Sequence, residues 1–595
     1  MNEKVVVIVR RALESIDART GGAVNDAEVV VPEGDPAKFG HFSTNAAMKF
    51  AKARGMAPMD LARAIAEKAA AAAAPEGFFE KVEAAAPGFV NFWVSDAAWR
   101  DELAAVAAAH DPMARAKAAG GYGGRTVMVE FTDPNPFKLF HIGHLMSNTI
   151  GESFARLYEA AGAKVIRANY QGDVGLHVAK AVWGMGTLKE VMPAENADIG
   201  LKMVFLGEAY ARGAKAFEDE AQLEARGEIE ALNEEIYAKR NPEVNALYAA
   251  GRAWSLEYFE TVYARLGTKF DQYYFESEMA SPGLDAVDAG LEKGVFEKSD
   301  GAVVFPGEKY GLHTRVFVNS RGLPTYETKE LALNKKKFEE YAPDLSVIVT
   351  GNEVVDYFKV LLKAMALVLP PEVAERTRHV AHGMLRLPTG KMSSRTGDVI
   401  TADALLAQVK ERLREKVSER STLGDDDREA VTEAIAVGAV KYSILKQNPG
   451  ADIVFDFDKS LSFEGDAGPY LQYAYARLRS IARKAEEELG AGTGDGSFAK
   501  DGLAKLATEH ELALVRKIAE FPTVAAQAAA RLAPSAVAAY AYKLAVAANK
   551  FYETTPILKD EEAARRAARL ALAAEAARTL RAALDLLGMK VLERI

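Results

Sequence analysis

The sequence predicts a multidomain α/β protein in which a doubly wound parallel sheet lies between a small α+β domain and an all-α domain. Three observations predict this. Near residue 126, a strand pattern, a turn, a helical pattern and a second strand pattern follow one another. Before this point helix and strand signals alternate, and after residue 402 almost every pattern is helical. The 595 residues provide enough chain for several domains.

The amino-terminal region begins with helical patterns and then changes to a strand. Residues 46–74 are rich in alanine, lysine and methionine and predict helices, with a turn at Gly55 and a new helix starting at Pro58. Residues 84–93 predict a turn followed by a strand. The glycine-rich segment 120–124 predicts a domain boundary.

The central region contains the predicted parallel sheet and one long helical interruption. Residues 188–266 are charged and helical, and we interpret them as an insertion. The other expected elements are a helix over 145–161 and strands over 126–131, 164–168, 302–305, 315–318 and 346–349. In the last third, helices are predicted over 430–445, 470–489, 511–521, 536–552 and 560–587, with a loop at 490–497.

Composition excludes several classes of protein without selecting one. The chain has no cysteine, which excludes disulfides, thiol nucleophiles and thiolate metal sites and fits a reducing cytosol. We expect no secretory signal and no membrane span. The net charge of −10 describes the whole surface, so it does not argue for or against a local nucleic-acid site.

The segment His141-Ile142-Gly143-His144 joins a predicted strand to a predicted helix. The free N–H groups of a helix start suit phosphate, and two imidazoles three positions apart would donate to one phosphate chain. Gly143 would let a nucleotide approach the backbone closely. The alternatives are two unrelated surface histidines or a metal pair, although no third ligand lies at a metal-site spacing. The motif alone would also suit other nucleotidylyl transferases.

A second motif carries cations and hydroxyls between two glycines. Its residues are Lys391, Met392, Ser393, Ser394 and Arg395. This composition suits a triphosphate whose charge rises during reaction. A P-loop is excluded, because Gly383 and Gly390 are too far apart and methionine follows the lysine where serine or threonine is required. The alternative is an ordinary basic surface loop.

Together, in this order and separation, the two motifs resemble the HIGH and KMSK signatures of class I aminoacyl-tRNA synthetases. The resemblance narrows to arginyl-tRNA synthetases and covers nearly the whole chain, through segments 39–48, 87–93, 129–151, 169–175, 468–480 and 586–595. It implies a class I Rossmann-type parallel-sheet catalytic domain (119–405), a small α+β tRNA-elbow domain (1–118) and an all-α anticodon-binding domain (406–595).

The signatures depart from the family pattern in two places. Val174 replaces the tryptophan of the GDWG segment, and Ser394 replaces the second lysine of KMSK. Many family members carry a lysine just before HIGH instead, and Lys138 stands there, so we assign it to the triphosphate. The alternative for Lys138 is a solvated turn lysine.

Arginine selection requires carboxylates, because a guanidinium offers a planar fork of donors. By resemblance, Glu276 binds the guanidinium, and Tyr326 with Glu330 closes the side-chain pocket; positions four apart share a helix face. Glu330 stands where the family has aspartate. The remaining assignments are Glu130 and Asn135 at the ammonium and carboxylate of arginine, and Asn352 and Glu353 at the ATP ribose or adenine. For each acid the alternative is a solvated or salt-bridged surface group.

The resemblance implies that ATP activates arginine to an adenylate, which then passes to the terminal ribose of tRNA-Arg. We expect His141, His144, Lys138, Lys391 and Arg395 to supply positive groups, with Mg²⁺ neutralising further phosphate charge. It also implies a monomer in the cytoplasm. The alternatives are an inactive tRNA-binding paralogue and a synthetase for another amino acid.

Aromatic and basic residues interleave in the last domain, which suits the stacking and edge hydrogen bonds that read unstacked bases. We assign Arg477, Arg479, Asn549 and Phe551 to tRNA. Tyrosines at helical spacing are more often core, so most of the segment 470–475 is expected to pack internally.

Overall fold

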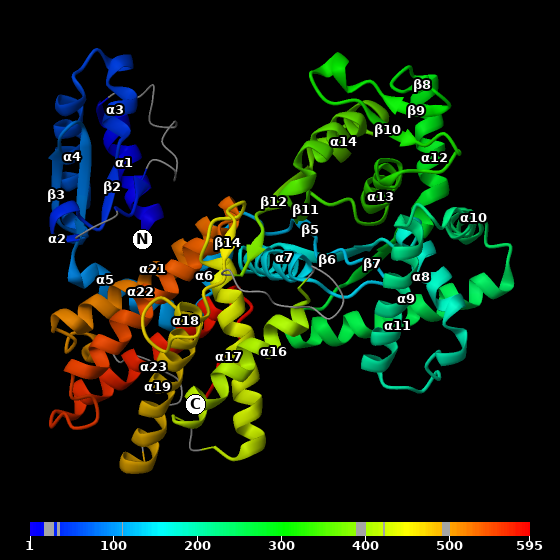
Figure 1. Cartoon of the computed structure of the whole chain (residues 1–595). Coiled ribbons are helices and arrows are strands. Elements are labelled where there is room, and N and C mark those ends of the chain that lie inside the picture. The colour runs from blue at the N-terminus through cyan, green and yellow to red at the C-terminus, as the bar shows by residue number, and fades with distance from the viewer. Residues whose placement is uncertain (17–28, 33–35, 110, 388–399, 421–422, 491–499) are drawn as a thin grey trace.

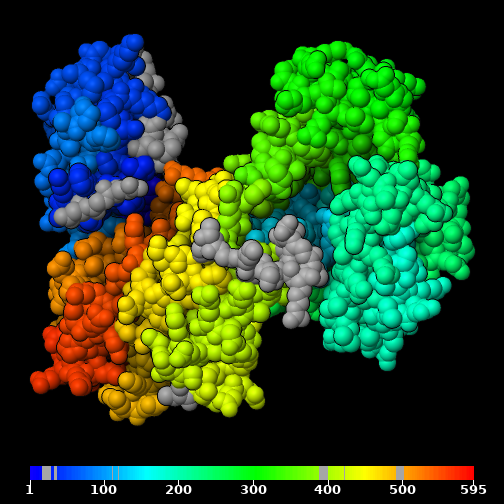
Figure 2. Space-filling view, in the orientation of Figure 1, coloured from blue at the N-terminus to red at the C-terminus, as the bar shows by residue number. Residues whose placement is uncertain are grey.

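The computed structural model describes residues 1–16, 29–32, 36–109, 111–387, 400–420, 423–490 and 500–595. A central parallel sheet separates two groups of domains (Figure 1). The amino-terminal and carboxyl-terminal domains lie on one side of it, and the insertion helices and a small second sheet lie on the other (Figure 2). The predicted multidomain α/β fold is confirmed.

The amino-terminal domain contains an antiparallel sheet with the order β1-β2-β4-β3. Its elements are α1 (Asn2–Ile16), β1 (Val29–Val30), α2 (Pro36–Phe39), β2 (Phe42–Thr44), α3 (Ala46–Phe50), η3 (Lys52–Arg54), α4 (Pro58–Ala73), η4 (Ala74–Glu76), β3 (Phe79–Ala85), β4 (Phe89–Val94), α5 (Asp96–Ala108) and α6 (Ala114–Ala119). The predicted turn at Gly55 and the helix start at Pro58 are confirmed. Strand β3 was missed, because none of its residues is buried and its sequence shows no apolar alternation.

The central sheet is parallel throughout, with the order β12-β11-β5-β6-β7. Its strands and the helices between them are β5 (Thr126–Glu130), α7 (Ile142–Ala160), β6 (Lys164–Gln171), β7 (Gln272–Phe275), β11 (Leu345–Gly351), η7 (Asn352–Val354), α14 (Val355–Val368), α15 (Pro371–Glu375) and β12 (Thr377–His382). The strand order reverses between β5 and β11. Ligands bind at the carboxyl ends of strands at such a switch point.

The predicted strands at 302–305 and 315–318 form, but they do not join the parallel sheet. They pair in a small antiparallel sheet with the order β10-β9-β8. This region consists of α12 (Glu276–Glu292), β8 (Glu297–Ser299), β9 (Ala302–Phe305), η6 (Gly307–Tyr310), β10 (Arg315–Val318) and α13 (Tyr326–Tyr341). The alternation of side chains predicts a strand, but it does not predict which strand pairs with it.

The residues assigned to the insertion are helical, as their pattern predicts. They form η5 (Lys189–Val191), α9 (Ile199–Glu218), α10 (Leu223–Ala238) and α11 (Pro242–Leu266), and α8 (Leu176–Thr187) precedes them. Helices α8 and α9 pack backbone against backbone. A Cβ at Gly184 would lie 1.9 Å from the Ala209 carbonyl oxygen, and one at Gly213 would lie 1.9 Å from that of Lys180. The two glycines therefore set the distance between these helices.

The last region is helical as predicted, apart from the two-stranded pairing of β13 and β14. Its elements are β13 (Leu385–Arg386), α16 (Ala402–Ser418), α17 (Asp425–Leu445), β14 (Ile453–Val454), α18 (Phe457–Ser460), α19 (Gly468–Leu489), α20 (Lys500–Leu503), α21 (Glu509–Arg531), α22 (Pro534–Thr554) and α23 (Ala563–Leu586). The predicted helix end at Phe521 is wrong. Helix α21 continues through Pro522 to Arg531, because Pro522, Ala525 and Ala528 are buried and their packing outweighs the lost backbone hydrogen bond.

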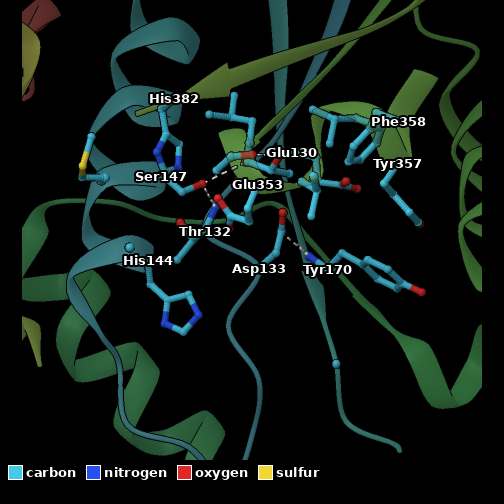
Figure 3. Close-up of a pocket in the computed structure, with 18 of the residues that line it drawn as sticks. Glu130, Thr132, Asp133, His144, Ser147, Tyr170, Glu353, Tyr357, Phe358 and His382 are labelled. Atoms are coloured by element: carbon cyan, nitrogen blue, oxygen red, sulfur yellow. Dashed lines mark hydrogen bonds between the residues drawn. The ribbon is translucent and has the colours of Figure 1, made fainter. Parts of the chain in front are cut away.

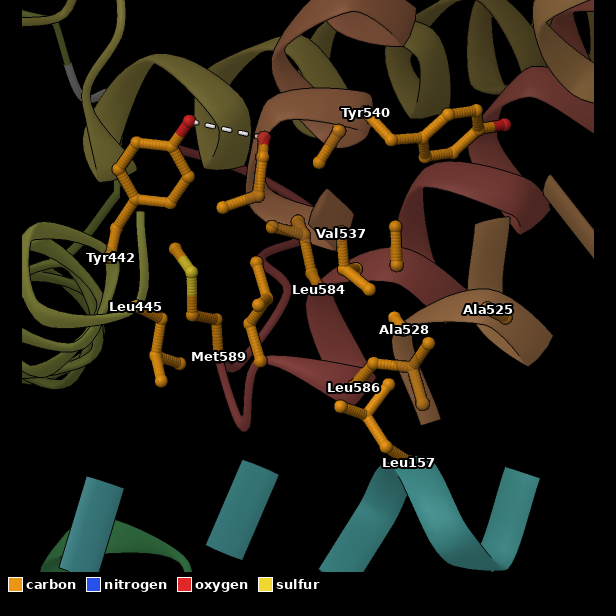
Figure 4. Packing of buried hydrophobic residues seen from close by; sticks show 14 of the residues in the cluster. Leu157, Tyr442, Leu445, Ala525, Ala528, Val537, Tyr540, Leu584, Leu586 and Met589 are labelled. Carbon is orange, nitrogen blue, oxygen red and sulfur yellow. Dashed lines mark hydrogen bonds between the residues drawn. The ribbon is translucent and has the colours of Figure 1, made fainter. Parts of the chain in front are cut away.

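The carboxyl-terminal domain is fixed to the back of helix α7. Leu157 of α7 faces Leu586 at the end of α23 (Figure 4), and the Ser153 hydroxyl donates to the Leu586 carbonyl over 2.8 Å. The buried Lys441 ammonium donates to the carbonyl of Leu266 at the end of α11 and to that of Gly588. Among the described residues, no helix combines the length and the apolar character that crossing a membrane requires.

Candidate functional site

A cavity of about 780 Å³ lies at the carboxyl ends of the parallel strands, where the strand order reverses (Figure 3). Its walls come from the ends of β5, β6, β11 and β12, from the start of α7, and from α12 and α13. The sequence-predicted site residues that line this central cavity are Glu130, Asn135, His141, Gly143, His144, Glu276, Tyr326, Glu330 and Glu353. The structure therefore brings together residues from both halves of the parallel sheet.

The two histidines cap the start of helix α7 and hold each other in place. His141 Nδ1 accepts hydrogen bonds from the backbone N–H groups of Gly143 (3.1 Å) and His144 (3.3 Å). His144 Nδ1 accepts in return from the His141 N–H over 3.3 Å, and the two ring centroids are 3.5 Å apart. This is a reciprocal capping box built from imidazoles. Because Nδ1 of each ring is an acceptor, each neutral ring carries its proton on Nε2.

The pKa of both histidines is lowered, which favours their neutral forms at physiological pH. Burial, reinforced by Lys138, lowers the pKa of His141 to about 4. Burial and the neighbouring His141 lower the pKa of His144 well below its usual value. These lowered pKa values argue against the expectation that the rings supply positive charge. The rings supply neutral N–H donors, which still suit phosphate oxygens.

Gly143 leaves room for the capping ring of His141. A Cβ at this position would lie 2.9 Å from both Nδ1 and Cε1 of His141, closer than real Cβ contacts. The ring could then not cap the helix in its present place. Close approach of a nucleotide to Gly143 stays a prediction.

The loop after β5 adds cavity residues that the sequence analysis missed. Thr132 and Asp133 have φ angles of 78° and 43°, a left-handed conformation that is costly for residues with side chains. The Ser147 hydroxyl accepts from the Thr132 N–H (2.9 Å) and donates to the Val349 carbonyl (3.0 Å). Asp133 Oδ1 accepts from the Tyr170 N–H over 2.8 Å. These bonds tie the loop to α7, β6 and β11, as Figure 3 shows.

Six carboxyl groups line the same cavity. Four of them, which we call the carboxylate group, are Glu130, Asp133, Glu276 and Glu330. Two lysines of α13 form buried ion pairs with them, Lys329 with Glu276 and Lys337 with Glu130. Burial raises the pKa of Glu276 to about 7, although Lys329 opposes the shift. Burial together with Glu130 raises the pKa of Glu330 and of Asp133. The alternative that Glu130, Glu276 and Glu330 are solvated surface groups is excluded, since each is at most 8% exposed.

Tyr326 and Glu330 reach the cavity from one face of helix α13, as their spacing predicts. The side chains of Asn135 and Glu276 both lie close to Gly172. A Cβ at Gly172 would lie 2.3 Å from Asn135 Oδ1 and 3.2 Å from Glu276 Oε1. The glycine therefore allows the amide and the carboxylate to line one wall together.

Lys138 does not line the central cavity. It lines an adjoining cavity of about 820 Å³, together with His141, Asn135 and helix α9. Its ammonium group lies 5.1 Å from the centre of the Tyr210 ring on α9. Because His141 and Asn135 line both cavities, Lys138 remains adjacent to the histidines.

The structure separates two neighbouring residues of η7. Both are exposed, but Glu353 lines the central cavity and Asn352 does not. Val174 is buried in the apolar core and does not line the cavity either, so it takes no part in its wall. The adjacent Asp173, which was missed, is fully buried and accepts from Tyr248, Arg252 and Ser277.

Lys391, Met392, Ser393, Ser394 and Arg395 lie outside the described residues. The described residues on either side of them adjoin the site. Met384 and Leu385 line the central cavity, and the Ile400 carbonyl accepts from the N–H of Ile142 in the histidine motif over 3.1 Å. Both neighbouring segments therefore meet the wall that carries the histidines.

The predicted tRNA residues of the last domain have different surroundings. Arg477 donates to the side-chain oxygen of Asn549 (3.0 Å), and Arg479 donates to Glu593 (2.8 Å). Phe551 is fully buried, so its assignment to direct tRNA contact is wrong. The next residue, Tyr552, is 38% exposed and lies 5.2 Å from Arg477.

Comparison with known families finds matches along almost the whole chain. Residues 114–457 match the family described as tRNA synthetases class I (R), catalytic domain. Residues 471–595 match the DALR anticodon binding domain, and residues 4–94 match the arginyl tRNA synthetase N terminal domain. The first of these matches alone covers more than half of the sequence.

Individual relatives agree with the family matches. The chain is 34% identical over 476 residues to the arginine–tRNA ligase of Treponema denticola, which covers 79% of each chain. It is 30% identical over 531 residues to that of Parabacteroides distasonis, covering 85% of this chain and 86% of the relative. The arginyl-tRNA synthetase structure from Thermus thermophilus has the same fold, with a TM-score of 0.79 over 100% of both chains at 23% identity.

Proposed function

The chain belongs to the arginyl-tRNA synthetase family, and from this premise we propose which residues activate arginine with ATP and pass it to tRNA-Arg. The arginine carboxylate attacks the α-phosphorus of ATP, the bond to the β-phosphate oxygen breaks, and pyrophosphate leaves. A hydroxyl of the terminal tRNA ribose then attacks the adenylate carbonyl, and AMP leaves. One observation carries the proposal: neutral histidine donors and buried carboxylates line one cavity at the switch point of the sheet.

Arginine lies among the carboxylate group in this proposal. Glu276 binds the guanidinium, and Tyr326 with Glu330 closes the pocket around it; all three line the cavity. Glu130, Asp133 and Asn135 bind the ammonium and carboxylate of arginine. A substrate without the charged fork would leave the carboxylate oxygens that face the cavity without a substrate donor, which supports selection by charge.

ATP lies along the start of α7. The Nε2–H groups of His141 and His144 and the backbone at Gly143 donate to phosphate oxygens, while Glu353 and Asn352 lie toward the nucleoside. Lys138, Lys391 and Arg395 supply positive charge to the triphosphate, and Met392, Ser393 and Ser394 complete its binding segment. No general base is needed, because the attacking carboxylate is already ionised at neutral pH. Catalysis then rests on positioning and on stabilising phosphate charge.

Magnesium, in our proposal, enters with ATP and supplies charge neutralisation at the phosphates. Among the described residues, no cluster of three or more His, Cys, Asp or Glu side chains would hold a metal ion. Mg²⁺ usually keeps several waters and binds chiefly through substrate phosphates, so it does not need such a cluster. The protein residues listed above therefore position the nucleotide, and the ion accompanies it.

The outer domains bind the tRNA. We assign residues 1–118 to its elbow and residues 406–595 to its anticodon, with Arg477, Arg479 and Asn549 as contacts and the catalytic domain at 119–405. The insertion, near 188–266, shares a cavity with His141, and we assign it a structural or tRNA-facing role. We place the protein in the cytoplasm, as a monomer.

The proposal is tested by ATP–pyrophosphate exchange on the purified full chain, with each of the twenty amino acids and with or without tRNA-Arg. Exchange with arginine, rising when tRNA is added, is the expected result. Exchange with another amino acid would keep the class and overturn the pocket assignment. Silence under every condition would favour the inactive tRNA-binding paralogue.

A further inference from the structure

Lys329 is a buried lysine that the reaction described above does not use. It lies on α13 and is not among the residues that line the central cavity. Its ammonium group forms an ion pair with Glu276, and both side chains are at most 5% exposed. The same ammonium lies 4.7 Å from the centre of the Tyr326 ring. A single cation therefore contacts two residues of the proposed guanidinium pocket from outside the cavity.

The two oxygens of Glu276 face different partners. Oε2 accepts from the Lys329 ammonium. Oε1 lies on the side of Gly172 and Asn135, since a Cβ at Gly172 would approach it to 3.2 Å. Because Glu276 and Asn135 line the cavity and Lys329 does not, the ion pair fixes which oxygen faces the substrate.

We propose that Lys329 is a positioning residue for arginine: it holds one oxygen of Glu276 from behind the cavity wall and presents the other to the guanidinium. The inference rests on the proposed function, which supplies the guanidinium. An ammonium bound to one oxygen leaves the carboxylate in a single orientation. A charge-assisted hydrogen bond to the substrate then needs no side-chain reorganisation.

The surroundings of Glu276 give Lys329 a second effect, on ionisation. Burial raises the pKa of Glu276 to about 7, Lys329 lowers it, and Asp173 raises it further. Without Lys329 the two raising influences would remain, so the carboxyl group would be protonated at neutral pH. A protonated carboxyl has no charge to offer a guanidinium, which stays charged at every accessible pH.

Other titratable groups face this pair from each neighbouring element. They are Tyr326 and Glu330 on α13, Tyr170 on β6, Asp173 after it, His177 on α8, Tyr237 on α10, and Tyr357 on α14. None of these groups forms an ion pair with Glu276; among the described residues that pair is formed by Lys329.

The test measures arginine and ATP KM in tRNA-supported ATP–pyrophosphate exchange for Lys329→Met, from pH 6 to 9. We expect the arginine KM at pH 7 to rise about tenfold or more, since one pKa unit is a factor of ten. The increase should shrink as the pH rises, with a midpoint above that of the wild type, while the ATP KM stays unchanged. Lys329→Arg, which keeps the cation, should restore part of the loss.

Lys336→Met is the matched control, because Lys336 lies on the same helix and pairs with Glu340 at the surface over 2.8 Å. A second comparison sets Glu276→Gln against Lys329→Met/Glu276→Gln, which carries no unpaired buried charge and so guards against misfolding of the single variant. If Lys329 acts through Glu276, the double variant has the same arginine KM as Glu276→Gln.

Two results would overturn the inference in an enzyme whose wild type is active with arginine. One is an arginine KM of Lys329→Met that equals that of the wild type, or that exceeds it by the same factor at every pH. The other is a further loss in the double variant equal to the loss in Lys329→Met alone. A wild type without arginine-dependent exchange would instead refute the proposed function.

Discussion

His141 and His144 lie within one turn of α7 and hydrogen-bond to each other's backbone, whereas the carboxylate group comes from a strand, a loop and two helices that are distant in sequence. The histidines need no partner outside their own motif to fix their rings. The carboxylates of Glu130 and Glu276 depend on lysines of α13. One wall of the cavity is therefore built locally, and the other only when α12 and α13 dock on the sheet.

The two walls also differ in charge. Burial removes the charge of the histidines by lowering their pKa, so they offer neutral donors to phosphate. Burial raises the pKa of Glu276 toward neutrality, and Lys329 keeps it from rising further. A shift in pH between 6 and 8 should consequently act on the carboxylate wall and leave the histidine wall unchanged.

The largest expected effect comes from removing a donor of the histidine wall. His144→Ala should lower the rate of ATP–pyrophosphate exchange by about 10²–10³-fold, the loss typical for one preorganised donor at a developing negative charge. It also removes the acceptor of the His141 N–H. The measurement is exchange at saturating arginine, with His510→Ala on α21 as the control. A near-normal rate would place the phosphates elsewhere.

The next effect tests the carboxylate wall. Glu276→Gln should raise the arginine KM by about 10–100-fold, because a charge-assisted hydrogen bond contributes about 1.5–3 kcal/mol, while the ATP KM stays unchanged. Glu278→Gln, an exposed acid on the same helix, is the control. Equal losses for arginine and ATP would show that the two walls are not separate.

The local wall is also the one that the sequence predicted best. A strand, a turn and an apolar helical pattern placed His141, Gly143 and His144 at the carboxyl end of a parallel strand, and the structure has them there. The same reasoning gave the rings a positive charge, because burial at a helix start is not visible in the sequence.

The carboxylate wall required more than local pattern. Family resemblance supplied Glu130, Glu276 and Glu330, but Lys329 and Asp133 were missed because their roles arise from pairing between distant elements. In the carboxyl-terminal domain, the rotation of about 100° between neighbouring helical residues decides which aromatic residue of α22 is exposed. Phe551 faces the core, and its neighbour Tyr552 faces solvent.

In the wild-type protein, pH should affect the arginine KM and the ATP KM differently. The arginine KM should fall about tenfold between pH 6 and pH 8, because a raised carboxyl pKa means that Glu276 ionises only in this range. The ATP KM should stay flat, since the histidines are already neutral at pH 6. Initial exchange rates at each pH give both values. A flat arginine KM beside a changing ATP KM would reverse the assignment of charge.

The smallest effects come from two glycines, one in each wall. Gly143→Ala would push against the His141 ring, and Gly172→Ala would push against the amide of Asn135 and approach Glu276. Because each new methyl group meets the end of a movable side chain, we expect losses of only about threefold to tenfold, or roughly 1 kcal/mol. Gly143→Ala should act on ATP kinetics and Gly172→Ala on the arginine KM, measured in the same exchange assay. Gly55→Ala is the control for backbone strain. Gly55 is exposed and has a φ of 64°, and a Cβ there would meet nothing within 4 Å, so this variant contacts neither wall. If both cavity variants changed the kinetics of the same substrate, the two walls would be coupled through the loop between β5 and α7. The walls would then be built separately but would not function separately.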